Sequence, residues 1–230
     1  MIEYSILAAI LICSYLMGSF PSAVIISKRF FGFDIRTKGS GNMGSTNAFR
    51  VLGVKWGIVT QILDIFKGSL PVLIVSWVFT EGLIAGTIHL DTIVLMLIAG
   101  AGAILGHIYS MFVNFKGGKG INTALGVLIA ISPIDVGIAA LVFIIFVSFS
   151  GYISLGSIMA SLAFPSSIFI RKNLINAYIP DYDVLIYFAI VTASLLIFAH
   201  RSNIVRLLKG KENKFEKLQL IKLGTKKENS

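Results

Sequence analysis

A series of long apolar runs dominates this sequence and limits the folds that are open to it. Hydrophobic residues make up 56% of the 230 residues, only 13% are charged, and the mean hydropathy is +0.86. Soluble domains carry roughly 25% charged residues, and a single globule of this length has too little interior for so much apolar surface. The chain is therefore predicted to be an integral membrane protein.

The apolar runs also predict the number of membrane spans, since one spanning helix needs about 20 apolar residues. The runs cover residues 2–26, 58–79, 92–105 continued by 108–112, 121–149, 153–170 and 184–199. The run 121–149 exceeds one span and has a natural break at Ser132-Pro133, because proline cannot continue a helical hydrogen-bond ladder. Continuous apolar runs favour helices over the alternating strands of a barrel. We predict an all-α fold with about seven transmembrane helices, with five or six spans as alternatives.

The distribution of basic residues predicts the orientation of these helices. Six Lys or Arg residues lie between Lys28 and Lys55, and nine lie between Arg201 and Lys227. Basic loops stay on the cytoplasmic side, so the N-terminus is expected outside and the C-terminus in the cytoplasm. Residues 1–208 are read as one membrane-embedded domain and 209–230 as a basic cytoplasmic tail. The net charge of +9 fits attraction to anionic lipids or to an anionic substrate, and no nucleic-acid motif accompanies it.

The segment 18–53 has the composition of an anion-binding loop. It contains the turn GSGNMGSTN at 39–47, and Arg50 follows this turn. Small residues allow backbone N–H groups to turn toward a bound anion, and the nearby cations supply charge. Beside a membrane span, such a loop indicates a substrate with a phosphate head. Lys28, Arg29 and Lys38 are also explained by topology and lipid attraction alone.

A second glycine-rich segment, GHIYSMFVNFKGGKG, covers residues 106–120. Lys116 and Lys119 bracket Gly117 and Gly118, a pattern in which backbone and charge both approach an oxyanion. The order of residues is not that of a P-loop, so it gives no support for an ATPase. The alternative interpretation is a tight cytoplasmic turn whose lysines only set the topology.

Two further motifs carry polar side chains at helical spacing. In GYISLGS, Ser154 and Ser157 share one helix face, although membrane serines often bond only to helix carbonyls. In AHRSNIVRLLKG, His200 and Asn203 also share a face. A histidine at a helix end is alternatively explained by its contact with the terminal carbonyls.

Charged residues inside an apolar run need a partner. Asp64 and Lys67 lie three positions apart within the run 58–79, and ionisable groups in a membrane are costly unless they are paired. We expect a mutual ion pair that shapes the site, in preference to direct chemistry. His107 is read as a helix-end or packing residue.

These motifs together resemble those of the bacterial acyl-phosphate:glycerol-3-phosphate acyltransferases. The strings GSFPSAVIISK, DIRTKGSGNMGSTNAFRVLG, GHIYSMFVNFKGGKGINTALG, SLGSI and HRSNIVRLLKGKE follow the order of that family and spread over about 190 residues. The resemblance implies a seven-helix membrane fold in the bacterial inner membrane, with a site that faces the cytoplasm. It implies acyl transfer from acyl phosphate to the 1-hydroxyl of glycerol 3-phosphate, which gives lysophosphatidic acid and phosphate in the first acylation of phospholipid synthesis.

The resemblance also implies the residues of the site and its substrates, and the proton route is inferred from the chemistry of an activated acyl phosphate. The expected partners are the two substrates, membrane lipids and an enzyme that produces acyl phosphate; no cofactor or metal is expected, and the chain is expected to be a monomer. The hydroxyl proton is expected to pass to the substrate phosphate, with His200 as the competing base. Small departures from the family pattern occur at Ser45, Ser110 and Gly156. The catalytic groups implied are Ser40, Arg50, Lys119, His200 and Asn203, and the substrate-binding residues implied are Gly39, Gly41, Asn42, Thr46, Asn47, Gly117, Gly118 and Ser154.

Two other classes of protein share parts of this pattern. A transporter or channel for a phosphorylated solute explains the membrane spans and the anion-binding loops equally well from composition. Transporters usually carry internal repeats and polar residues deep in the bilayer, whereas this chain has no evident repeat and its motifs collect at one face. A CDP-alcohol phosphotransferase is disfavoured because the aspartate-rich metal motif of that class is missing.

Overall fold

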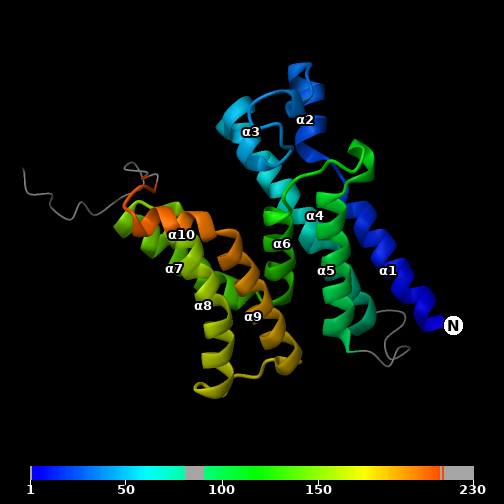
Figure 1. Cartoon of the computed structure of the whole chain (residues 1–230). Helices are drawn as coiled ribbons and strands as arrows, with labels where there is room; N and C mark the ends of the chain where they lie inside the picture. The colour runs from blue at the N-terminus through cyan, green and yellow to red at the C-terminus, as the bar shows by residue number, and fades with distance from the viewer. Residues whose placement is uncertain (1, 81–90, 213, 215–230) are drawn as a thin grey trace, which may run out of the picture. The chain divides into compact units, whose positions relative to one another are not determined.

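The computed structural model describes residues 2–80, 91–212 and 214, and these residues are helical with no strand (Figure 1). They fall into two compact units, Met1–Ser132 and Pro133–Ser230. The all-α prediction is confirmed. The division at Ser132-Pro133 coincides with the predicted break, because α6 ends at Ile131 and α7 begins at Pro133.

The first unit holds the long apolar helices of the N-terminal half and the two glycine-rich loops. Its elements are α1 (Ile2–Gly18), α2 (Ser22–Phe31), η1 (Ile35–Thr37), α3 (Ser45–Leu52), α4 (Val54–Thr80), α5 (Thr92–Ile108), η2 (Met111–Val113) and α6 (Ile121–Ile131). Helix α1 packs beside α5, and α4 packs against both α5 and α6.

The first apolar run does not form one continuous helix. Helix α1 ends at Gly18 and α2 begins after Pro21, which lacks the backbone N–H that a continuous helix needs. The carbonyl groups freed by this break are bonded to side chains from other helices: Lys67 Nζ donates to the carbonyl of Phe20 (2.7 Å), and Ser110 Oγ donates to that of Ser19. Within a bilayer such internal partners are required, since no water replaces them.

Glycines allow the helix backbones of the first unit to approach closely. A Cβ atom at Gly18 or Gly106 would collide with the backbone of the facing helix in the α1–α5 pair, and one at Gly68 or Gly126 would do so in the α4–α6 pair. Small residues at such positions increase van der Waals contact, which drives helix association in lipid. These contacts fix α4, α5 and α6, which carry or border the second glycine-rich loop.

A small apolar core lies beneath the first loop. Side chains from α2, η1, α3 and η2 form it, and Phe33, Trp56 and Leu63 pack against it. The core residues are Ala23, Val24, Ile26, Ile35, Met43, Ala48, Leu52 and Val113. This core anchors the turn 39–47 on both sides, because Ile35 precedes the turn and Ala48 follows it.

The second unit consists of α7 (Pro133–Ser150), α8 (Ile153–Asn173), α9 (Tyr182–Ala199) and α10 (Arg201–Leu208). Helix α8 packs against both α7 and α9, and α10 contacts α8 and α9. Asp135 on α7 is fully buried; it accepts hydrogen bonds from Arg171 Nη1 (2.6 Å) and Ser167 Oγ (2.8 Å) of α8. The bridge joins these helices and gives Arg171 a structural role.

Among the described residues, five helical segments are long and apolar enough to cross a membrane. They are Tyr4–Phe31, Val54–Phe79, Thr92–Val113, Pro133–Ser150 and Ile153–Asn173, and the shorter apolar helices are Ile121–Ile131 and Tyr182–Phe198. The count of seven spans, the orientation and the single-domain boundary stay predictions. Most of the predicted tail lies outside the described residues.

Candidate active site

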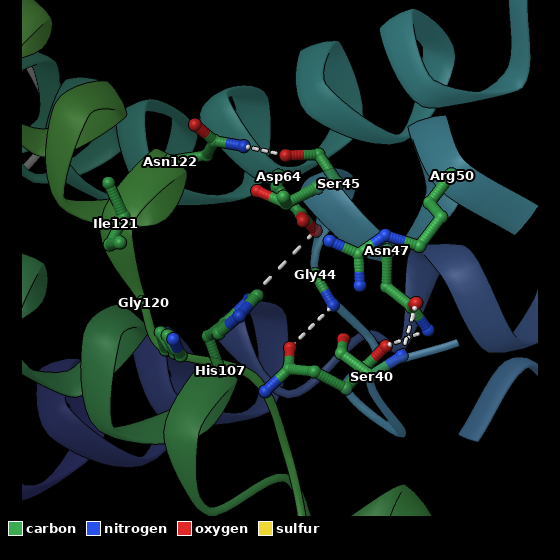
Figure 2. Close-up of a pocket in the computed structure, with 13 residues that line it drawn as sticks. Ser40, Gly44, Ser45, Asn47, Arg50, Asp64, His107, Gly120, Ile121 and Asn122 are labelled. Atoms are coloured by element: carbon green, nitrogen blue, oxygen red, sulfur yellow. Dashed lines mark hydrogen bonds and ion pairs between the residues drawn. The ribbon is translucent and has the colours of Figure 1, made fainter. Parts of the chain in front are cut away.

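The glycine-rich loops of the first unit meet around one cavity of about 270 Å³. This volume is close to the lower end of the range of about 300–1,000 Å³ that small-molecule pockets occupy. Both loops, α4 and α5 contribute to the wall, as Figure 2 shows. The residues that line the cavity are Ser40, Asn42, Gly44, Ser45, Thr46, Asn47, Arg50, Asp64, His107, Lys119, Gly120, Ile121 and Asn122. It therefore brings together six of the predicted site residues: Ser40, Asn42, Thr46, Asn47, Arg50 and Lys119.

Asn47 holds the first loop in its folded shape. Its Oδ1 accepts the backbone N–H of Ser40 (2.9 Å), and its Nδ2 donates to the carbonyls of Lys38 (3.1 Å) and Asn42 (2.8 Å). The residue is buried. These bonds close the turn around a single amide, and they support a structural contribution of Asn47 alongside its predicted contact with substrate.

The predicted glycines of this loop explain its tight path. Gly39 and Gly41 have φ values of +62° and +71°, a region that residues with a Cβ rarely adopt. A Cβ at Gly39 would also collide with the Asn47 side chain. Neither glycine lines the cavity, so their observed role is to let the chain turn and present Ser40 and Asn42 to it.

The cavity also lies at the beginnings of α3 and α6. Gly44, Ser45 and Thr46 open α3, Gly120, Ile121 and Asn122 open α6, and all six line the cavity. No side chain caps either helix. The first N–H groups of a helix lack intrahelical partners and carry partial positive charge. The two helix N-termini are therefore suited to bind an anion.

Arg50 and Lys119 are the cations that line this cavity. Both are exposed, and neither forms an ion pair with any acidic side chain in the part of the chain that the structure describes. Two cations of the segment 18–53 that lie outside the cavity are engaged elsewhere. Arg36 and Lys28 pair with Asp34 at 2.8 Å and 3.3 Å. Arg50 and Lys119 thus remain available for a ligand.

The Asp34–Arg36 pair ties the first loop to the second. Arg36 donates through Nε and Nη2 to the two carboxylate oxygens of Asp34 and through Nη1 to the carbonyl of Val113 (3.1 Å). The hydrogen bond from Arg36 holds the pKa of Asp34 well below its ordinary value. The same hydrogen bond raises the pKa of Arg36. Asp34 therefore stays ionised and Arg36 stays attached at any physiological pH.

In the second loop, the Gly117-Gly118 pair packs on the end of α5. The N–H of Gly117 donates to the carbonyl of Ile108 and that of Gly118 to the carbonyl of His107, both at 3.0 Å. Neither glycine lines the cavity. Their N–H groups are thus used inside the protein, whereas the prediction from sequence was that the glycines contact the substrate. Lys119, the next residue, does reach the cavity.

Sequence reasoning left several residues of this cavity wall without a site role. Asp64 and His107 are buried in it, with His107 Nδ1 3.9 Å from Asp64 Oδ1. Asp64 pairs with Lys67 at 2.9 Å, which confirms the expected ion pair. Asn122 Nδ2 donates to Ser45 Oγ at 2.7 Å and so links the beginnings of α6 and α3 (Figure 2). The residues of this last pair are 77 positions apart, so no local pattern could reveal them.

The remaining predicted site residues, Ser154, His200 and Asn203, belong to the second unit. His200 Nδ1 lies 2.8 Å from the carbonyl of Leu196, the helix-end contact foreseen as its alternative role. Asn203 Nδ2 donates to Glu212 Oε1 (3.0 Å). Ser154 is buried, and its Oγ makes no direct hydrogen bond among the described residues, although it lies near enough to Glu212 to affect that carboxyl.

Glu212 is the group that brings the C-terminal motif together, and no role was predicted for it beyond its place in HRSNIVRLLKGKE. Arg206 Nε donates to its Oε2 at 2.7 Å. Burial raises the pKa of Glu212, but the hydrogen bonds from Arg206 and Asn203 outweigh this effect and hold the pKa below its ordinary value. The side chain of Asn203 is thereby fixed by a charged partner.

The described residues combine membrane-length apolar helices with a basic cavity at two helix N-termini, which are the features of a membrane-embedded protein with a site suited to an anion. Comparison with known families specifies the class: the model of the family "Glycerol-3-phosphate acyltransferase" matches residues 8–210. The chain belongs to this family and is an acyltransferase. The family inferred from the motifs is confirmed, and the transporter and the CDP-alcohol phosphotransferase are set aside.

Individual relatives agree with this assignment. The chain is 42% identical over 226 residues to a glycerol-3-phosphate acyltransferase of Chlorobium phaeobacteroides (strain BS1), covering 90% of this chain and 96% of the relative. It is 41% identical over 221 residues to that of Chlorobaculum tepidum, covering 90% and 95% of the two chains.

Solved structures of a related protein show a similar fold. The glycerol 3-phosphate form of PlsY (YgiH), an integral membrane glycerol 3-phosphate acyltransferase, superimposes with a TM-score of 0.67 at 36% identity, covering 91% of this chain and 95% of that one. Its lysophosphatidic acid form gives a TM-score of 0.68 at 35% identity, with coverage of 93% and 97%.

Proposed function

We propose that this chain transfers a fatty acyl group from acyl phosphate to the 1-hydroxyl of glycerol 3-phosphate. The products are lysophosphatidic acid and inorganic phosphate. The observation that carries the proposal is the convergence of two uncapped helix N-termini with Arg50 and Lys119 on one cavity. Both substrates carry a phosphate group, so the reaction needs positive charge at a confined place more than it needs any other feature.

The two cations of the cavity, Arg50 and Lys119, are suited to bind phosphate in different ways. The guanidinium of Arg50 is suited to grip a phosphate through two parallel hydrogen bonds, and Lys119 supplies a compact positive charge. Ser40 and Asn42 lie beside them on the cavity wall and would line the acyl-phosphate head. The predicted roles of Ser154, His200 and Asn203 are to hold glycerol 3-phosphate. The acyl tail is expected near Phe112 and Phe115, which are exposed.

The chemical step is a displacement at an activated carbonyl. The glycerol hydroxyl oxygen forms a bond to the acyl carbonyl carbon, the bond from that carbon to the phosphate oxygen breaks, and phosphate leaves. The hydroxyl proton passes to the departing phosphate, which is a sufficient base once the cations hold it in place. Alignment and charge stabilisation then supply most of the rate enhancement.

His200 is the alternative proton acceptor. If its Nδ1 carries the proton that bonds the carbonyl of Leu196, its Nε2 is unprotonated in the neutral ring. His200→Gln separates the routes: with phosphate as the base, the variant keeps most of its turnover at saturating glycerol 3-phosphate. A loss of about 100-fold or more at saturation assigns the proton to His200 instead.

The proposal also includes the oligomeric state, the membrane and the orientation of the enzyme. The enzyme works as a monomer in the bacterial inner membrane with its cavity facing the cytoplasm, and it depends on another enzyme for its acyl phosphate. Support for this orientation comes from the basic loop 28–55, since basic loops stay in the cytoplasm. We propose no cofactor.

The test of the proposed site removes one cation at a time. Arg50→Ala and Lys119→Ala in purified protein should each lower kcat/KM for acyl transfer by about 100-fold or more, as expected for loss of a preorganised charge at a reacting phosphate. The matched control is Lys38→Ala, since Lys38 stacks over the Phe33 ring at 3.9 Å and does not line the cavity. Normal kinetics for either cavity variant would remove that cation from the site.

A further inference from the structure

The buried cluster in the cavity wall combines charged side chains with an imidazole. Asp64 Oδ1 accepts from Lys67 Nζ (2.9 Å) and from Ser22 Oγ (3.0 Å), and Lys67 also donates to the carbonyl of Phe20. Asp64, Lys67 and His107 are each at most 5% exposed. Desolvated charges are costly unless they are fixed in good geometry, so Asp64 has a position set by α2 and by its own helix α4.

His107 lies between this cluster and the second glycine-rich loop. On one side its Nδ1 is 3.9 Å from Asp64 Oδ1, as Figure 2 shows. On the other side, a Cβ added at Gly118 would collide with its Nε2. The ring therefore occupies the space that Gly118 leaves open by lacking a side chain.

The backbone of this residue holds the same loop. The carbonyl of His107 accepts the N–H of Gly118, and the carbonyl of Ile108 accepts that of Gly117 (both 3.0 Å). Lys119 follows directly and lines the cavity. Asp64, the imidazole and Gly118, which precedes the cavity lysine, thus lie next to one another, although His107 Nδ1 makes no hydrogen bond among the described residues.

We propose that His107, oriented by Asp64, is a positioning residue that sets the place of Lys119 in the cavity. The ring forms the wall on which the segment 117–119 folds, and Asp64 determines the orientation of that wall. His107 lines the cavity wall, and its proposed effect is exerted through the placement of Lys119. This inference rests on the proposed function, since it assigns Lys119 a phosphate to bind.

The test is a double-mutant cycle on kcat/KM for glycerol 3-phosphate, measured with labelled acceptor and purified full-length protein. The four proteins are the wild type, His107→Ala, Lys119→Arg and the double variant. Lys119→Arg keeps the charge, so a rate remains to be measured, but arginine does not reproduce lysine geometry. His107→Ala should lower kcat/KM about 10–100-fold with Lys119 in place, because a misplacement of about 1 Å costs on this order.

In the Lys119→Arg background, His107→Ala should lower kcat/KM by less than about 3-fold, because the effects of substitutions at two coupled residues are not additive. An equal cost in both backgrounds would overturn the proposal, because His107 would then act independently of Lys119. The control is Leu95→Ala, which empties a buried position on the same helix. It should lower the melting temperature and change kcat/KM equally in both backgrounds.

A conservative variant separates a loss of positioning from a loss of the fold. His107→Asn keeps an N–H at about the position of Nδ1 and some of the wall, so it should lose less than His107→Ala and retain the dependence on Lys119. A loss as large as that of His107→Ala, with an unchanged melting temperature, would contradict a role for Asp64 in orienting the ring. Failure of the proposed function is distinguished by the wild type, which would then form no lysophosphatidic acid.

Discussion

A methyl group at Gly117 is the sharpest perturbation of the loop that carries Lys119. A Cβ there would lie 2.6 Å from the carbonyl oxygen of Ile108, and it would collide with that of His107. Ordinary contact begins at 3.4 Å, so the first contact alone requires a displacement of about 0.8 Å, the difference between these distances. Backbone carbonyls at a helix end do not rotate away as side chains do. The displacement therefore falls on the loop.

The expected kinetic cost follows from that displacement. A shift of about 1 Å in a catalytic group costs on the order of 100-fold, so Gly117→Ala should lower kcat/KM for acyl transfer by about 10–100-fold. Overpacking of this kind also costs about 1–3 kcal/mol of stability. Initial rates with labelled glycerol 3-phosphate, together with a melting curve in the same detergent, separate the two effects.

The matched control is Gly137→Ala in α7. A Cβ at Gly137 meets nothing within 4 Å, and alanine stabilises a helix interior by about 0.5–1 kcal/mol relative to glycine. This variant should keep wild-type kinetics. Wild-type kcat/KM in Gly117→Ala would show that the packing of the loop on α5 does not fix Lys119.

Three further variants test other contacts. Ser45→Ala removes the acceptor for Asn122 at the cavity and should raise KM for glycerol 3-phosphate a few-fold with a melting temperature close to that of the wild type; an unchanged KM would show that this link does not shape the cavity. Arg171→Met removes the guanidinium that bonds the buried carboxylate of Asp135 and should destabilise the protein by about 3–5 kcal/mol, measured by thermal or denaturant unfolding, and a stability within about 1 kcal/mol of wild type would contradict the importance of the bridge. The fold lowers the pKa of Asp34, so the ionised carboxylate stabilises the folded protein. This stabilisation is fully present above about pH 4, the ordinary pKa of Asp, and it is lost as the pH falls through the lower pKa of the folded state. Asp34→Asn should therefore lower the melting temperature at pH 7, and the gap to wild type should narrow on acidification below about pH 4; a gap that is constant with pH would contradict this.

Much of the fold follows from local properties of the sequence. The apolar runs predict membrane helices because each helix satisfies its own backbone, and Pro133 predicts the break because of its missing N–H. The interruption at Ser19–Pro21 was not predicted. It depends on Lys67 and Ser110, whose side chains bind the freed carbonyls from other segments, and such partners have no signature near the break.

The site was predictable in its chemistry and less so in its division of labour. Glycine, serine and basic residues indicate an anion site, and Arg50 and Lys119 do line one cavity. The same composition does not reveal that the N–H groups of Gly117 and Gly118 bond to α5, or that Asn47 closes its own loop. Both outcomes depend on where a chain segment packs. The sequence predicts the Asp64–Lys67 ion pair that shapes the site, but for the same reason it does not show that Asp64 and His107 lie in the cavity wall.

In the proposed reaction, acyl phosphate is the donor and the cavity at Arg50 and Lys119 binds it. The most direct measurement is acylation of labelled glycerol 3-phosphate by purified protein supplied with acyl phosphate, acyl-CoA or acyl carrier protein as donor, at equal concentrations. Lysophosphatidic acid is expected from acyl phosphate alone, with one phosphate released per product. Comparable product from acyl-CoA or acyl carrier protein, or none from acyl phosphate, would contradict it.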